Sequence, residues 1–264
     1  MCHVSRIGVA WPSAVLLTAG LLLVGCGATS STSPSLVSGG GSSSSSTSAS
    51  PSSGSAGSGA SSGVDTLFPT TVGDTWVYND TLAGQQSGTT TNTIASATPD
   101  SAGERVEIKT HSDIAGLPTT PTMLTYQFNA DGSIKVPYAQ VGGNTVTIKS
   151  GGIVWPSRAQ LATGQPHTST LLVQVKAAGH KISVRAHVTV KGGGAQPVSV
   201  PAGTYQATVV DETISLQVAG INVAVVVKTW LANGVGPVKS VAFTKSGTVS
   251  EIASTEVLKS FTKG

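Results

Sequence analysis

The chain has 264 residues, and only 10% of them are Asp, Glu, Lys or Arg, which gives a formal net charge of +3. Its two cysteines are Cys2 and Cys26. The sequence after residue 26 therefore forms no disulfide and offers no thiolate nucleophile or metal ligand. Few aromatic residues accompany the basic ones, so the composition gives no support to nucleic-acid binding.

Residues 1–25 have the three parts of a secretory signal: Arg6 near the amino terminus, an apolar stretch, and the small residue Gly25 before Cys26. The segment Leu23-Val24-Gly25-Cys26 resembles the lipobox of bacterial lipoproteins. In that family the chain is cut before the cysteine and the thiol is acylated. The resemblance implies cleavage between Gly25 and Cys26 and a lipid anchor on Cys26, in the cell membrane or the outer membrane. The alternative is an uncleaved membrane anchor, for which the apolar stretch is short.

The segment 26–63 begins with Cys26, and the rest of it consists almost wholly of Ser, Gly, Ala, Thr and Pro. Such a segment has too little apolar surface to offset the entropy of ordering, so we expect a disordered linker. A glycosylated stalk is the alternative. Residues 64–264 have the length and composition of a single domain on the extracytoplasmic side.

Hydrophobic periodicity in residues 64–264 is two, the period of β-strands. The clearest example is residues 180–191, where Ile182, Val184, Ala186, Val188 and Val190 alternate with polar residues. Glycine-containing segments separate such runs and predict tight turns. The predicted strand pairs are 123–128 with 134–138, 171–176 with 180–191, 205–218 with 221–231, and 238–244 with 248–258.

Helical patterns are nearly absent, and only residues 157–163 favour a short helical turn. Sequential strands joined by tight turns pair antiparallel. Without helices to cover it, the sheet buries its apolar face on itself. The predicted fold is all-β: an antiparallel meander that forms a curved sheet, a half-barrel or a barrel, with a sandwich as the remaining alternative.

In the predicted strand 205–218 the apolar residues up to Val209 occupy odd positions, whereas those from Ile214 onward occupy even positions. In a regular strand the two sets would face opposite sides of the sheet. One extra residue between them restores a single apolar face, which predicts a β-bulge. Asp211 and Glu212 lie in that interval and form a candidate polar site, as a cation ligand or a base. The preferred interpretation is that the bulge bends the sheet and both carboxylates are solvated.

Other candidate sites have weaker patterns. The histidines at 111, 167, 180 and 187 show no spacing that brings ligands to one face, so we expect no metal site and no cofactor. Lys181, Arg185 and Lys191 share one strand face, either as a solvated surface or as a stripe for anionic headgroups. No nucleophile motif is present, and the glycines at 192–194 lack the lysine and helix of a phosphate loop.

Three segments together resemble a group of uncharacterised bacterial exported proteins and lipoproteins. They are Phe68-Pro-Thr-Thr-Val-Gly-Asp-Thr-Trp76-Val-Tyr78, Val200-Pro-Ala-Gly-Thr-Tyr205, and Trp230-Leu-Ala-Asn-Gly-Val-Gly-Pro-Val-Lys239. The resemblance implies a curved antiparallel sheet, similar to the half-barrels of lipoprotein carriers, and implies no activity. Turn formation by the glycines and burial of the aromatic residues also explain these motifs.

The sequence thus predicts a lipid-anchored envelope protein, not an enzyme, whose β domain serves binding or assembly. Its partners are the membrane, through Cys26, and an envelope protein or an apolar ligand, and nucleic acid is not among them. Two alternatives stay open: a half-barrel that carries an apolar ligand such as a lipid, and an enzyme of unrecognised type.

The lipid anchor is testable at Cys26. Because the acyl chain is attached to the cysteine thiol, Cys26→Ser should leave the precursor uncut and unlabelled by radioactive fatty acid. Labelling is measured on the immunoprecipitated protein, with wild type as the control. Equal labelling of the two proteins would contradict the assignment.

Overall fold

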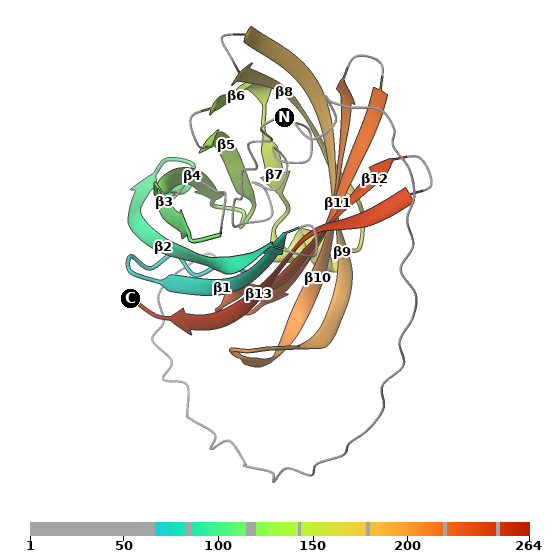
Figure 1. The fold of residues 1–264 in the computed structure, drawn as a ribbon. Helices are drawn as coiled ribbons and strands as arrows, with labels where there is room; N and C mark the ends of the chain where they lie inside the picture. The colour runs from blue at the N-terminus through green and yellow to red at the C-terminus, as the bar shows by residue number, and fades with distance from the viewer. Residues whose placement is uncertain are drawn as a thin grey trace, which may run out of the picture. The chain divides into compact units, whose positions relative to one another are not determined.

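The computed structural model describes residues 67–82, 86–114, 120–141, 144–177, 180–218, 221–246 and 249–264. These residues form an almost entirely antiparallel β structure (Figure 1) with a single short helix in the described part. The elements are β1 (Thr75–Leu82), β2 (Gln86–Asp100), β3 (Gly103–Ser112), β4 (Thr122–Asn129), β5 (Ile134–Val141), β6 (Asn144–Gly151), β7 (Ile153–Trp155), α2 (Arg158–Ala162), β8 (His167–Ala177), β9 (His180–Val200), β10 (Gly203–Val218), β11 (Ile221–Ala232), β12 (Gly236–Ser246) and β13 (Val249–Thr262).

The strands form one sheet in the order β4-β3-β2-β1-β13-β12-β11-β10-β9-β8-β6-β5-β7. A further pairing joins β4 to β5, so the two ends of this order meet and the sheet curls into a nearly closed barrel. Except for the β1–β13 pair, strands that pair lie near one another in the sequence. The predicted all-β meander is confirmed, as a barrel rather than an open sheet or a sandwich.

The predicted strand pairs all occur, as β4–β5, β8–β9, β10–β11 and β12–β13. The turn residues 178–179, 219–220 and 247–248 lie outside the described residues, as do the signal segment, the predicted linker and Cys26. The predicted helical turn is α2, which Ser157 begins with a capping box completed by Gln160.

The barrel wall is incomplete between β7 and β8. Strand β7 pairs with β5, and the first residues of β8 pair with β9, but no ladder joins β7 to β8 in the described residues. Helix α2 connects these two strands, and its Leu161 is buried. The backbone of Leu161 packs directly on Gly192 of β9, so α2 is held against the inner wall beside this seam.

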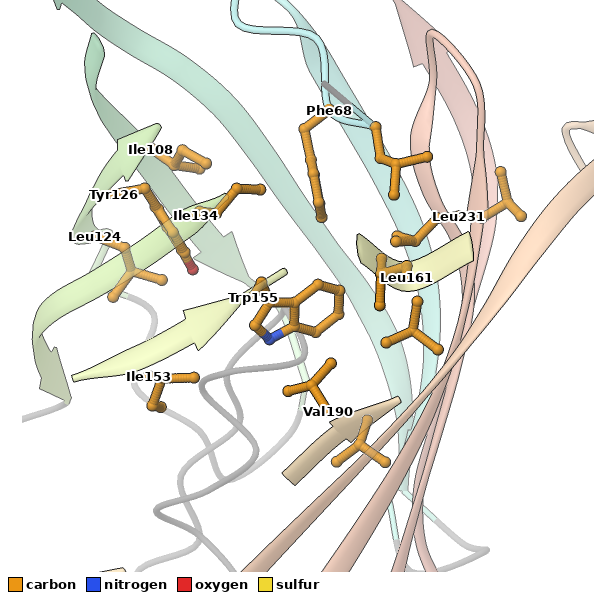
Figure 2. Close-up of a cluster of buried hydrophobic side chains, with 14 of the residues drawn as sticks. Phe68, Ile108, Leu124, Tyr126, Ile134, Ile153, Trp155, Leu161, Val190 and Leu231 are labelled. Carbon is orange, nitrogen blue, oxygen red and sulfur yellow. The ribbon is translucent and has the colours of Figure 1, made fainter. Parts of the chain in front are cut away.

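Inward-facing residues alternate along each strand, as the period of two requires. In β1, for example, Trp76, Tyr78 and Asp80 are buried, while the residues between them are half-exposed and Thr81 is exposed. The core includes aromatic residues that fill one part of the barrel. Phe68 meets the rings of Phe128 and Trp155 edge-on, with centroids 6.2 and 6.0 Å apart. Figure 2 shows Trp155 in the middle of this cluster.

The motif residues hold the amino-terminal strand against the far end of the sequence. The Trp76 Nε1–H donates to the Val235 carbonyl at 2.6 Å, and the Tyr78 hydroxyl donates to the Pro237 carbonyl at 2.9 Å. Gly236, with φ of +88°, lies between these acceptors, and a Cβ there would sit 3.5 Å from the Phe68 ring. The interpretation of Trp76 and Tyr78 as core aromatics is confirmed. Trp230 is half-buried, with the Lys239 ammonium 5.0 Å from its ring centroid.

The bulge predicted in strand 205–218 lies elsewhere. Strand β10 stays in regular register with β11 throughout. The shift occurs against β9, where Gly193 and Gly194 together oppose Val209. The extra residue therefore belongs to β9, and Gly194, with φ of +82°, adopts the left-handed conformation that such bulges favour. In the regular strand β10, Val210 and Ile214 face the barrel interior and Val209 faces the opposite side of the sheet. Val209 is apolar all the same because Gly193 of β9 packs against it and it is buried there.

None of the helices in the described ranges has the length and hydrophobicity needed to cross a membrane.

The contact between α2 and Gly192 can be tested with a single methyl group. A Cβ at Gly192 would collide with the Leu161 carbonyl, which is backbone and cannot move without moving α2. Gly192→Ala should lower the free energy of unfolding by about 1–3 kcal/mol in urea denaturation. Gly193→Ala is the matched control, since its Cβ makes only an ordinary 3.4 Å contact with Val209. Equal stability of the two variants would contradict this packing.

Candidate functional site

A band of polar side chains crosses the inner face of the barrel. It runs over six strands that are neighbours in the sheet, in the order β3-β2-β1-β13-β12-β11. All of its members are buried and occupy the inward phase of their strands. We call it the polar belt: Thr110, Ser112, Thr90, Asn92, Asp80, Glu256, Ser240 and Thr229. Buried polar groups cost free energy unless they are hydrogen-bonded, so such a band inside a core requires an explanation.

Part of the polar belt satisfies itself. The Thr110 hydroxyl donates to Asn92 Oδ1 at 2.8 Å. The hydroxyls of Thr90 and Ser112 are 2.9 Å apart, and those of Thr229 and Ser240 are 3.4 Å apart. Within the described part of the chain, however, both carboxylate oxygens of Asp80 and the Asn92 Nδ2 lack a hydrogen-bond partner of good geometry. The Thr90 hydroxyl is still close enough to Asp80 to lower its pKa.

The centre of the belt is the acidic pair, Asp80 of β1 and Glu256 of β13. The two residues lie directly opposite each other in the β1–β13 ladder. On the same face of a sheet, such partners have Cβ atoms about 5 Å apart. Asp80 is 3% exposed and Glu256 is 8% exposed. No Lys or Arg whose burial the structure describes is buried, so none stands inside the barrel to neutralise the pair.

Burial makes both carboxyl groups weak acids. It raises the pKa of Asp80 to about 6, with the nearby Thr90 hydroxyl opposing the rise and the Asp113 carboxylate adding to it. The pKa of Glu256 lies well above its ordinary value, first because of burial and then because of the Asp80 charge. Burial also raises the pKa of Tyr78 and Tyr126, and the Glu256 charge contributes to both, so the two phenols lie within its electrostatic reach.

Glu212 is a further buried acidic residue, separate from the acidic pair. The side chain of Glu212 is 1% exposed, and its Oε2 accepts a hydrogen bond of 3.1 Å from Trp155 Nε1, while Oε1 has no partner in the described residues. Burial raises the pKa of Glu212 to about 8, against the lowering effect of the Trp155 N–H. The expectation that both members of the Asp211–Glu212 pair are solvated is therefore wrong for Glu212. Its alternation with buried Val210 and Ile214 places it inside the barrel.

Asp211 points the other way. Its carboxylate lies 3.5 Å from the Lys228 ammonium, and both side chains are about 40% exposed. Adjacent residues on a strand face opposite sides of the sheet, so Asp211 and Glu212 cannot act together on one ligand. The structure separates the two candidate residues, one into the outer wall and the other into the core.

A pocket of about 270 Å³ lies at the seam between β7 and β8. Its lining includes Asp131, Ser133, Val154, Gln160 and His167. The Ser133 hydroxyl donates to Asp131 Oδ1 at 2.6 Å, and the Ser133 backbone N–H donates to the same oxygen at 2.9 Å. These bonds lower the pKa of Asp131 and commit the hydroxyl to the turn after β4. No hydrogen bond from Ser133 to His167 is present among the described contacts.

The remaining candidates lie apart from the polar belt. His111 and His187 are exposed, and His187 Nδ1 contacts the Thr170 hydroxyl at 3.1 Å. Lys181, Arg185 and Lys191 are exposed on β9. Gly25, Cys26 and the side chain of His180 are outside the described residues.

The acidic pair was not singled out in the sequence. The sequence does hold a signal for it, because both acids stand at positions where the alternation calls for an apolar residue. Asp80 follows Trp76 and Tyr78 at intervals of two, and Glu256 precedes Leu258 by two. A carboxylate in the apolar phase of a strand indicates a buried acid. The pairing of the two strands, 176 positions apart, was not visible in the sequence.

Comparison with known proteins identifies the architecture. Residues 128–258 match the family model described as DUF3108-like. A crystal structure from Bacteroides fragilis, provisionally named an exported protein with a YmcC-like fold, is 17% identical, with a TM-score of 0.54 over 74% of this chain and 98% of the other. The barrel has the YmcC-like fold. A Parabacteroides distasonis protein, provisionally named a lipoprotein, is 14% identical, with a TM-score of 0.58 over 76% of this chain and all of the other. No match was found among curated proteins.

The buried acids predict an unusual pH dependence of stability. The folded pKa of Glu212 is about 8 and its ordinary value is 4.5, so between these values the folded state holds a proton that the unfolded chain has lost. The free energy of unfolding should therefore fall as pH rises from about 4.5 to 8, by up to about 1.4 kcal/mol per pH unit for each such group.

Glu212→Gln should flatten this slope and make the domain more stable than wild type at pH 8, measured by urea denaturation across the pH range. Asp211→Asn is the neighbouring control and should keep the wild-type slope, because Asp211 lies on the outer wall. A slope unchanged by Glu212→Gln would show that Glu212 ionises freely in the folded state.

Proposed function

We propose that this protein is a lipid-anchored, non-catalytic binding protein of the bacterial cell envelope, and that its ligand contacts the polar belt inside the barrel. The observation that carries the proposal is the set of buried polar atoms without partners, on Asp80 and Asn92. Leaving such atoms unpaired costs about 1–3 kcal/mol each, and more for a charged group. A ligand that supplies their hydrogen bonds removes this cost.

The anchor and the location rest on two independent supports. The first is the lipobox that ends at Cys26. The second is the fold, because the similar structures carry the names of an exported protein and a lipoprotein. The domain then faces the extracytoplasmic side, where the predicted linker allows it to reach ligands or partner proteins near the membrane.

A binding role is better supported than catalysis. The hydroxyls beside the acidic pair bond to other hydroxyls, Thr90 to Ser112 and Ser240 to Thr229. Ser133 in the pocket at the seam is hydrogen-bonded to Asp131. A wholly apolar ligand is also less well supported. The apolar part of the interior is occupied by Phe68, Trp155 and Leu161 (Figure 2), and such a ligand would leave the polar belt unpaired.

The experiment is to extract the full chain from membranes in mild detergent and record native mass spectra, followed by analysis of the denatured extract. We expect one small molecule bound per barrel, released on unfolding. Asn92→Leu should reduce the bound fraction, because it removes belt polarity at nearly constant volume, and Asp211→Asn on the outer wall should not.

Two outcomes would contradict the proposal. If wild type carries no small molecule under conditions that preserve the fold, the barrel interior is structural. If the bound species is purely hydrocarbon and Asn92→Leu retains it fully, the protein is a carrier of apolar ligands and the polar belt is not its site.

A further inference from the structure

We infer that the acidic pair, Asp80 and Glu256, is a binding site for a protonated amine, so that the ligand of the barrel carries an ammonium group on a small or apolar body. This inference rests on the proposed function and names the class of its ligand. The argument uses the charge, the surrounding groups and the access of the pair.

The first argument is charge. Two carboxyl groups lie side by side in the barrel interior. Two cations on the neighbouring strands β11 and β12 have other partners: Lys228 pairs with Asp211, and Lys239 covers Trp230. Asp80 is buried, and in the described residues neither of its oxygens has a hydrogen-bond partner of good geometry, so the Thr90 hydroxyl beside it leaves its hydrogen-bonding capacity unfilled. Buried carboxylates require a cation or a proton. An ammonium group provides the charge together with three hydrogen-bond donors.

The second argument is the surroundings of the pair. Ser240 lies directly opposite Glu256 in the β12–β13 ladder, and Thr90 is close enough to Asp80 to affect its ionisation. These hydroxyls are acceptors for the remaining ammonium protons. Tyr78 precedes Asp80 on the same face of β1, and the Tyr126 ring points from β4 into the interior (Figure 2). Aromatic faces next to carboxylates are the typical surroundings of bound ammonium groups.

A metal ion fits these residues less well. Calcium takes six to eight oxygen ligands and magnesium requires a near-octahedral set. The described residues contain no group of three His, Cys, Asp or Glu side chains placed to hold a metal ion. Glu212, the other buried acid, is bonded to Trp155. Two carboxylates flanked by hydroxyls and phenols match an ammonium ion more closely than a divalent metal.

The third argument is access. Glu256 and Ser112, at 8% exposure each, are the most exposed members of the polar belt. Two residues beyond the pair, Leu82 and Ser254 are half-exposed and lie opposite each other. Asp80 therefore lies two residues before the end of β1, while Glu256 lies in the middle of β13. The end of β1 is therefore the side from which we expect an amine to approach the pair.

Proton competition makes the inference testable without a variant. At low pH both carboxyl groups hold protons, since the pKa of each is raised, and an ammonium ion has to displace them. Affinity for an amine should therefore rise with pH between about 5 and 8. The other ionisable groups facing the pair are Tyr78 and Tyr126, whose raised pKa values keep them neutral in this range, and Asp113 near Asp80, whose pKa is lowered by bonds to Thr89.

The experiment measures binding of hexylammonium to the full-length protein by calorimetry at pH 5.5 and pH 8, with hexanol, hexanoate and calcium chloride as comparison probes. We expect hexylammonium to bind about tenfold or more tightly at pH 8 than at pH 5.5. Asp80→Asn and Glu256→Gln should each weaken binding about 10- to 100-fold, the range for loss of a charge-assisted hydrogen bond. Glu212→Gln, a buried acid outside the pair, should bind as wild type does.

The other outcomes separate this inference from the proposed function. Equal binding of hexanol and hexylammonium, or binding independent of pH, overturns the amine while leaving a ligand in the barrel. Calcium binding that depends on Asp80 overturns it in favour of a metal ion. If no probe binds but a native ligand is retained, the ligand is of another class; if neither is found, the proposed function fails as well.

Discussion

The pairing of β1 with β13 is the constraint on which the rest of the structure depends. Every other pairing joins strands that lie close in the sequence, but this one joins the first strand to the last. It links the β1–β4 segment to the β8–β13 segment and, together with the β4–β5 pairing, turns a meander into a barrel. With one short helix in the described residues, the apolar face has nothing else to pack against, so closure is what buries it.

The three motifs that suggested a protein family support this closure. Trp76 and Tyr78 donate to the carbonyls of Val235 and Pro237, and the Ala202 N–H donates to the Leu258 carbonyl. The segments meet around the β1–β13 pairing although they are far apart in the sequence. Their residues are committed to packing and to backbone hydrogen bonds. The motifs are therefore features of the fold, and the candidate site consists of other residues.

Closure also creates the site. Asp80 and Glu256 become neighbours only because β1 and β13 pair in this register, and the same pairing removes both carboxyl groups from water. A core of this size would be more stable with apolar residues at these positions, since unpaired buried carboxyls weaken folding at neutral pH. The two buried carboxyl groups therefore lower the stability of the domain at the site where we propose that the ligand binds. In the function we propose, ligand binding and folding place opposite demands on the same few inward positions.

The sequence by itself determined the all-β class, the hairpins and the short helical turn, because strand periodicity and turn chemistry are local properties. It also indicated which residues of β1 and β13 share a phase. Tertiary structure alone decided three matters: the closure of the barrel, the position of the bulge at Gly193 and Gly194, and the burial of Glu212. Each depends on which strand lies alongside. Whether a carboxylate in a strand is solvated or buried depends on what packs against it across the barrel. Local periodicity does not reveal that two strands whose residues are 176 positions apart will pair.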